Sequence, residues 1–111
     1  MGRMERDKGR KGEREVAAIY ERAGFEIRGL EGSGDHLAIG YGLTIHSESK
    51  RQEVTRPWLW DEQANSEAPA GALPIVSFRR SRSVWIAQVR LEPLLGAIED
   101  AYGAGLERGL R

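Results

Sequence analysis

The hydrophobic pattern of this 111-residue chain changes repeatedly between the 3.6-residue period of a helix and the alternation of an extended strand. Helical spacing is found over residues 11–23, around 56–66 and from Pro93 onward. Shorter alternating or apolar runs lie between these segments. The chain length suits one domain. We therefore predict a single α/β domain with the element order α-β-β-β-α-β-β-α.

The expected strands and connections follow from the same pattern. Strands are predicted at residues 25–30, 35–39, 43–50, 73–78 and 83–90. Gly24 ends the first helix, and a tight turn at Gly40–Gly42 joins two strands into a hairpin. Residues 79–82 form the basic tip of a second hairpin. Residues 1–10 have no hydrophobic period and are expected to form a flexible basic arm before the folded domain of residues 11–111.

Composition excludes several classes of protein. The chain has 40% apolar residues, 17 basic and 17 acidic side chains, and no cysteine. It has no apolar run long enough to span a membrane, no secretory signal and no thiol chemistry. We expect a cytoplasmic protein of a prokaryotic cell or a phage. The charges are segregated, because residues 1–14 and 76–90 are basic, which favours either a nucleic-acid-binding face or a plain solvated surface.

One segment carries a pattern of metal-binding chemistry. Asp35 is followed, thirteen residues later, by Glu48-Ser49-Lys50. Alternation along a strand places Glu48 and Lys50 on one face, together with His46, and the hairpin turn brings Asp35 beside Glu48. Two carboxylates can hold a hard divalent cation, and the lysine can orient water or offset phosphate charge. The alternative is an exposed ion pair on a solvated strand.

The helix face or strand position of the other charged residues indicates their roles. Glu13 lies on the apolar face of the first helix, either as a third acidic group of the same site or as a charge at the helix end. Glu15 and Glu21 fall on other faces and are interpreted as ordinary surface charges. His46 shares the face of Glu48 but is interpreted as a plain strand histidine, and two histidines are too few for a zinc site.

These residues resemble a known family. The segments that carry the resemblance are Lys11-Gly12-Glu13-Arg14-Glu15, Ala23-Gly24-Phe25, Gly32-Ser33, Asp35 and Glu48-Ser49-Lys50. They resemble the archaeal-type Holliday junction resolvases of the PD-(D/E)xK nuclease superfamily over roughly residues 10–90. Two features depart from the pattern: Gly34 replaces the proline before the aspartate, and the loop before Asp35 is short and lacks lysines found in some relatives.

The resemblance implies a restriction-endonuclease-like core, with a central mixed β-sheet flanked by helices. It implies that Asp35 and Glu48, with Ser49 and Glu13, bind Mg²⁺, or Mn²⁺ in its place. It further implies that Lys50 is the catalytic lysine and that Ser33 is the loop serine linked to catalysis. Together with the basic segments it gives a set of candidate DNA contacts: Lys11, Arg14, Arg28, Arg51, Arg79, Arg80 and Arg82.

The expected function is metal-dependent resolution of four-way DNA junctions by paired nicks, without a small organic cofactor or a membrane partner. The sequence Trp58-Leu59-Trp60 cannot bury all three side chains in one core, which favours a homodimer formed through the outward side of this helix. Three alternatives stay open. They are a nuclease of the same superfamily acting on other branched or linear DNA, a non-catalytic DNA-binding module, and a homodimeric scaffold.

Overall fold

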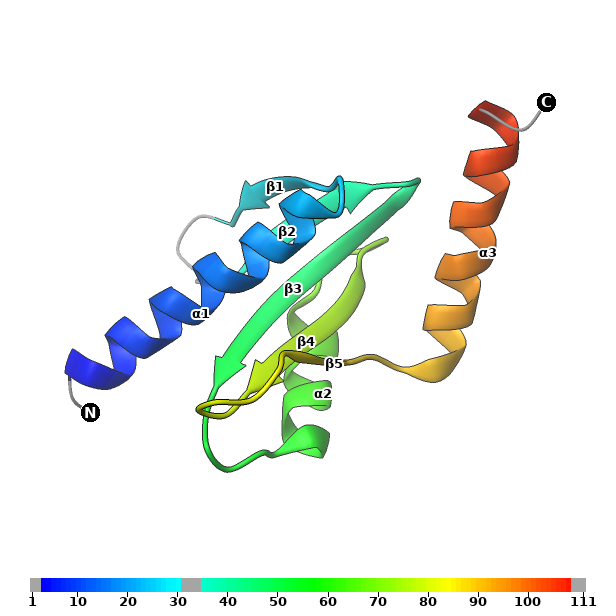
Figure 1. Cartoon of the computed structure of the whole chain (residues 1–111). Coiled ribbons are helices and arrows are strands. Elements are labelled where there is room, and N and C mark those ends of the chain that lie inside the picture. The colour runs from blue at the N-terminus through cyan, green and yellow to red at the C-terminus, as the bar shows by residue number, and fades with distance from the viewer. Residues whose placement is uncertain (1–2, 31–34, 109–111) are drawn as a thin grey trace.

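The structure is a computed structural model that describes residues 3–30 and 35–108, and it confirms the predicted α/β fold and element order (Figure 1). A five-stranded sheet is flanked by three helices. The elements are α1 (Arg3–Arg22), β1 (Glu26–Gly29), β2 (His36–Gly40), β3 (Leu43–Arg51), α2 (Pro57–Glu67), β4 (Leu73–Arg79), β5 (Ile86–Gln88) and α3 (Leu91–Arg108).

The sheet is mixed and its strands lie in sequence order, β1-β2-β3-β4-β5. Only β3 and β4 pair in parallel, and α2 provides the crossover that such a pair requires. In the β2–β3 hairpin Leu37 lies opposite His46, and across the parallel pair Glu48 lies beside Val76. Tyr41 and Gly42 adopt positive φ angles of 54° and 75° in the tight turn, as the predicted hairpin requires.

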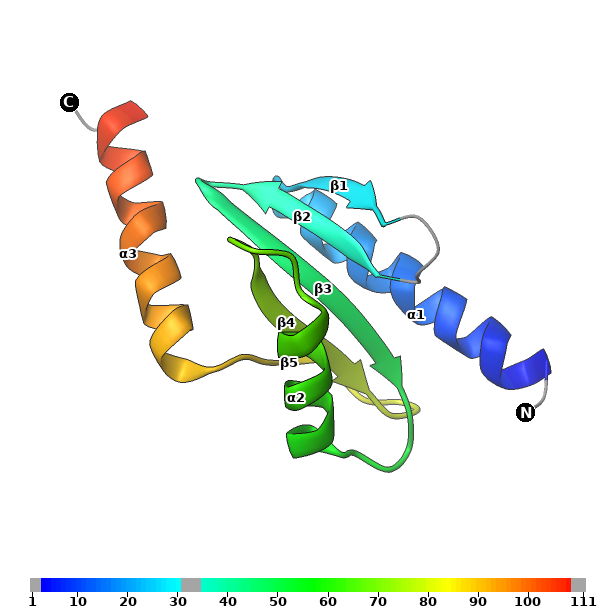
Figure 2. The ribbon, with the colours of Figure 1, turned by 180° about the vertical axis from the view of Figure 1, so that it is seen from behind.

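The two long faces of the sheet are covered by different helices (Figures 1 and 2). On one face α2 buries Trp60 and Ala64 against Val76, and Trp60 packs on Phe78 with 5.5 Å between ring centroids. On the other face lies α1, whose Tyr20 contacts the ring of His36. Because both faces of β3 are covered, residues 45–48 are all buried, and so the polar side chains of this run are held away from water.

Helix α1 begins at Arg3, so the prediction of a flexible arm before Lys11 is wrong for residues 3–10, which are helical. This segment has no apolar period because it extends beyond the sheet that α1 packs on (Figure 1). It is nevertheless rich in arginine, lysine, glutamate and methionine, which have high intrinsic helix propensity. The helix therefore continues through residues 3–10 because of their intrinsic helix propensity, without burial against the sheet.

The C-terminal part of the chain differs from the prediction in two bounds. Strand β5 is limited to residues 86–88, where 83–90 were expected, because Ser83 belongs to the turn that closes the hairpin. Helix α3 begins at Leu91, with Pro93 in its first turn, where a missing N–H costs nothing. The predicted start of α2 is confirmed, with Arg56 as N-cap and Pro57 in the first turn.

Helix α3 stands at the side of the sheet and contacts the starting ends of β3 and β4 (Figure 1). Its half-buried residues include Leu94 and Ala97. An adjacent stripe is exposed to solvent and consists of Leu91, Leu95, Ile98 and Tyr102. None of the helices in the described ranges combines the length and the hydropathy needed to cross a lipid bilayer.

Candidate metal centre

Three potential metal ligands meet at the open end of the β2–β3 hairpin. Asp35 directly precedes β2, whereas His46 and Glu48 lie two residues apart on β3 and therefore share one face of the strand. The antiparallel register pairs His36 with Ser47, so Asp35 comes next to Glu48. One ligand atom from each residue lies within 4.8 Å of the others, and Nε2 of His46 is 3.5 Å from Oδ2 of Asp35.

Two of these side chains are deeply buried and incompletely satisfied. His46 is 2% exposed and Glu48 is 3% exposed. Nδ1 of His46 and Oε1 of Glu48 have no hydrogen-bond partner among the described residues. A buried polar atom left in this state costs about 1–3 kcal/mol. A divalent cation accepts electron pairs from both atom types, so the donor set fits a metal ion.

The Glu48 carboxyl is held in an environment that disfavours its charge. Burial raises the pKa of Glu48 to about 8, and a side-chain hydrogen bond with Glu67 and the charges of Asp35 and Glu67 act in the same direction. The Lys50 ammonium opposes this shift. In the metal-free protein the neutral form of Glu48 is therefore favoured more than in an ordinary exposed glutamate.

Asp35 and Glu13 lie close enough to repel each other. Burial raises the pKa of Asp35, and the charge of Glu67 adds to this, whereas His46 and Lys50 lower it. Burial also raises the pKa of Glu13, and Asp35 raises it further, against the opposing charges of two arginines of α1. The shift of Glu13 thus identifies α1 as the element that brings a further carboxyl toward Asp35.

The structure brings together most of the residues that the sequence singled out. Asp35, Glu48 and Lys50 interact as expected, and Glu13 lies near Asp35. Ser49 lies on the opposite face of β3 from Glu48, which leaves only its carbonyl for the predicted metal contact. Ser33 lies outside the described residues.

Two members of this centre were not predicted from the sequence. His46, interpreted as a plain strand histidine, offers a ring nitrogen within 4.8 Å of ligand atoms of Asp35 and Glu48, so it belongs to the group that could hold a metal ion. Its shared face with Glu48 was the available signal. Glu67 is the last residue of α2 and lies just beyond the helix predicted around residues 56–66. Only the docking of α2 onto the sheet brings it to Glu48, and no local spacing reveals that contact.

The raised pKa of Glu48 predicts a pH dependence of stability in chelator. The folded pKa, about 8, exceeds the ordinary value of 4.5, so the folded state binds the proton more tightly. Stability is therefore greatest at low pH and falls as pH rises from about 4.5 to about 8, with a slope of at most ~1.4 kcal/mol per pH unit for one proton. Urea unfolding between pH 5 and 9 measures this slope.

The matched control is Glu48→Gln, which keeps the size of the side chain and removes its titration. The difference in unfolding free energy between the two proteins isolates Glu48, because His36, whose pKa is lowered by burial, titrates in both. We expect the wild type to lose stability relative to the variant between pH 5 and 8. A difference that stays constant with pH would contradict the raised pKa.

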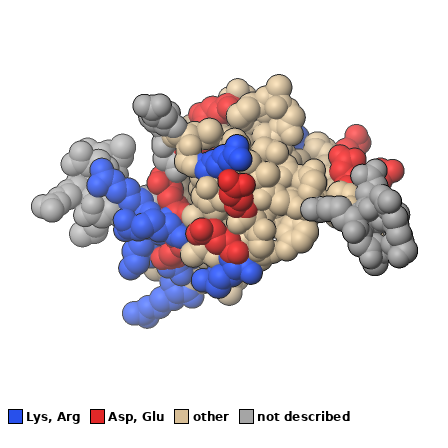
Figure 3. Space-filling view, turned by 90° about the horizontal axis from the view of Figure 1, so that it is seen from above, with Lys and Arg blue, Asp and Glu red and all other residues tan. Residues whose placement is uncertain are grey.

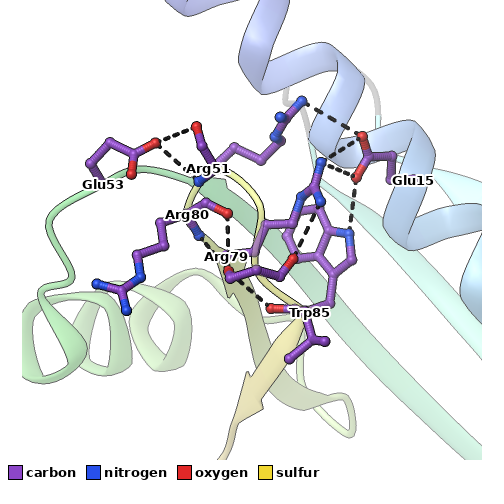
Figure 4. Close-up of polar contacts among 9 residues, drawn as sticks. Glu15, Arg51, Glu53, Arg79, Arg80 and Trp85 are labelled. Atoms are coloured by element: carbon purple, nitrogen blue, oxygen red, sulfur yellow. Dashed lines mark hydrogen bonds and ion pairs between the residues drawn. The ribbon is translucent and has the colours of Figure 1, made fainter.

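A second polar cluster organises the neighbouring end of the sheet (Figure 4). Glu15 of α1 accepts a hydrogen bond from Nε1 of Trp85 at 3.0 Å and pairs with Arg79 at 3.2 Å and Arg51 at 3.6 Å. These two arginine side chains are only 21% and 13% exposed. The interpretation of Glu15 as an ordinary surface charge is therefore wrong. We refer to Glu15, Arg51, Arg79 and Trp85 as the Glu15 cluster.

The Glu15 cluster reduces the number of predicted DNA-contacting residues whose charge is free at the surface. Arg51 and Arg79 are engaged inside the protein, and Arg28 pairs with Glu26 at 3.3 Å on an exposed strand. Figure 3 shows lysine and arginine side chains gathered toward the end of the molecule at which α1 begins. The exposed basic residues of α1 and of the β4–β5 connection that share this end are Arg10, Lys11, Arg14, Arg80 and Arg82.

A scan against models of known protein families found no match, and a search of curated proteins found no significantly similar sequence.

Proposed function

We propose that the protein is a metal-dependent endodeoxyribonuclease that resolves four-way DNA junctions in the cytoplasm of a prokaryotic cell. One observation carries the proposal: Asp35, Glu48 and Lys50 converge at one end of the β2–β3 hairpin. Two carboxylates and a lysine can support hydrolysis of a phosphodiester, since the carboxylates can bind a cation and the lysine can stabilise negative charge on the phosphate.

Each side chain of the centre has a distinct role in this proposal. Asp35 and Glu48 hold Mg²⁺, or Mn²⁺ in its place, with the Ser49 carbonyl and Glu13 as further oxygen donors. The ion would supply polarisation of the phosphate and a lowered pKa for a bound water. Lys50 donates hydrogen bonds to a non-bridging phosphate oxygen and stabilises the negative charge that grows there. The Lys50 ammonium lowers the pKa of both Glu48 and Asp35, so it lies near these two carboxyl groups.

The exposed basic residues support binding to a DNA backbone. Lys11 and Arg14 on α1 and Arg80 and Arg82 beyond β4 are all exposed. Phosphate contacts of this kind position DNA without specifying bases, and the affinity falls steeply with salt. Selectivity then arises from the shape of the junction. Arg28, which pairs with Glu26, is a further candidate at the edge of the sheet.

A homodimer fits this substrate because resolution requires two symmetric nicks. Trp58 is 84% exposed and Leu59 is 56% exposed, whereas Trp60 is 3% exposed and packs inward. The outward side of α2 thus presents an aromatic and an aliphatic side chain that the described part of the chain does not cover. Such large apolar residues at a surface are typical of protein interfaces.

The test is cleavage of a labelled synthetic four-way junction beside a linear duplex of the same sequence, each with Mg²⁺ and with EDTA. We expect symmetric nicks on opposing strands of the junction only, and none in EDTA. A supercoiled plasmid with a cruciform reports dimer action, because two nicks made within one complex give linear rather than nicked circular DNA. Cleavage of both substrates would contradict the junction selectivity, and tight binding without cleavage would contradict the nuclease.

A further inference from the structure

The candidate metal centre contains a nitrogen donor that the sequence pattern did not assign to it. His46 is 2% exposed, and its Nε2 lies 3.5 Å from Oδ2 of Asp35. It stands two residues before Glu48 on β3, so both side chains project from the same face of the strand. Within the described residues, the group whose ligand atoms approach one another within 4.8 Å consists of Asp35, His46 and Glu48.

Polar atoms of this group are buried without a hydrogen-bond partner, as is Nε2 of His36, but among the described residues it is this group that also brings three potential ligand atoms together. Nδ1 of His46 and Oε1 of Glu48 are buried and make no hydrogen bond within the described part of the chain. A cation held between the carboxylates would satisfy Oε1 of Glu48, and Nε2 of His46, 3.5 Å from Oδ2 of Asp35, is the ring nitrogen shown beside these donors. A cation that accepts both nitrogen and oxygen donors could use all three side chains, so the imidazole indicates which class of cation suits the centre.

Cations differ in their acceptance of imidazole. Mg²⁺ requires a near-ideal octahedron of oxygen ligands and keeps several of its waters. Divalent transition-metal ions accept imidazole readily, and their affinity for sites with nitrogen and oxygen donors generally rises from Mn²⁺ to Cu²⁺ and is lower again for Zn²⁺. A histidine between two carboxylates therefore discriminates between these two classes of ion.

We infer that His46 is a metal ligand and that the Asp35–His46–Glu48 centre selects a divalent transition-metal ion over Mg²⁺. This inference rests on the metal-dependent function proposed above and names the class of its cofactor. The chain provides a matched control in His36, which is also a buried histidine at 5% exposure. His36 faces α1 on the other side of the sheet, with its ring 6.2 Å from that of Tyr20.

The first measurement is calorimetric titration of the full chain with Mn²⁺ and with Mg²⁺ at one pH, for the wild type, His46→Asn and His36→Asn. We expect the wild type to bind Mn²⁺ at least about tenfold more tightly than Mg²⁺. His46→Asn lowers the Mn²⁺ affinity about tenfold or more and changes the Mg²⁺ affinity far less, whereas His36→Asn leaves both unchanged. An equal loss of both affinities in His46→Asn, or no loss of either, would overturn the inference.

The second measurement needs no variant and so remains decisive if His46→Asn fails to fold. Imidazole ¹⁵N resonances of the wild type are recorded as diamagnetic Zn²⁺ is added. We expect one His46 nitrogen to shift on binding while the His36 nitrogens stay in place. Unchanged His46 resonances at saturation would overturn the inference.

The two proposals can fail separately. Junction cleavage in Mg²⁺ together with unchanged His46 resonances would overturn the role of His46 and leave the nuclease standing. A shifted His46 nitrogen in a protein that cleaves no DNA with Mn²⁺ or Mg²⁺ would support the metal assignment and contradict the nuclease.

Discussion

Replacing Glu48 with alanine is expected to lower junction cleavage at least about 1000-fold while changing junction affinity less than about threefold. The lost rate corresponds to ~4 kcal/mol of transition-state stabilisation. Glu48 contributes to the proposed metal centre and is 3% exposed, so it makes little direct contact with the DNA surface. Affinity depends instead on exposed arginines and lysines. Single-turnover cleavage and a binding titration in Ca²⁺ measure the two quantities separately.

The control for this variant is Glu99→Ala on α3, an exposed glutamate outside the centre. It should cleave like the wild type, which excludes a general effect of removing one negative charge. The prediction fails if Glu48→Ala retains more than a tenth of the wild-type rate. It also fails if the variant loses binding and cleavage in proportion, because Glu48 would then act in DNA binding rather than in the reaction.

Glu15→Ala is expected to reduce the free energy of unfolding by about 2–4 kcal/mol, which lowers Tm by roughly 10 °C or more. The glutamate accepts a hydrogen bond from Trp85 and balances the charges of Arg51 and Arg79. Its loss leaves two mostly buried guanidinium groups without their counter-ion and an indole N–H without its acceptor. Nε of each arginine already has no partner among the described residues, so little compensation is available. Urea or thermal unfolding measures the change.

Two variants make this result specific to the Glu15 cluster. Glu21→Ala, an exposed glutamate on the same helix, should change stability by less than about 0.5 kcal/mol. Glu15→Gln keeps an acceptor for Trp85 and loses the charge, so it should lie between the wild type and the alanine variant. Equal stabilities of Glu15→Ala and Glu21→Ala would show that the cluster contributes nothing to folding.

The local residue pattern was sufficient to predict the order of the helices and strands and several residues of the candidate metal centre. The strands, the Gly40–Gly42 turn and the start of α2 at Pro57 are set by alternation and backbone chemistry, which are properties of neighbouring residues. Asp35 and Glu48 meet because a tight turn fixes the register between them. The start of α1 was missed because helix propensity alone extends it beyond the sheet.

The remaining parts depend on tertiary packing and left no local signal. Glu67 reaches Glu48 only when α2 docks on the sheet. Glu15 finds Trp85, seventy positions away, and thereby becomes an internal anion instead of a surface charge. The sequence placed His46 on the same strand face as Glu48 but gave no further indication of a role in the centre. Whether a histidine can bind a metal depends on the donor atoms near it, which only the tertiary structure reveals.

The hairpin that carries the metal centre also determines how the centre is assembled from the chain. Asp35, His46 and Glu48 all lie between positions 35 and 48, joined by one tight turn. The loop entropy needed to bring them together is that of a short local closure, whereas the Glu15 cluster links residues from both halves of the chain. The ligand set is therefore of low contact order. A cation that binds these three residues stabilises a segment that can form before the parallel β3–β4 pair and its crossover are complete.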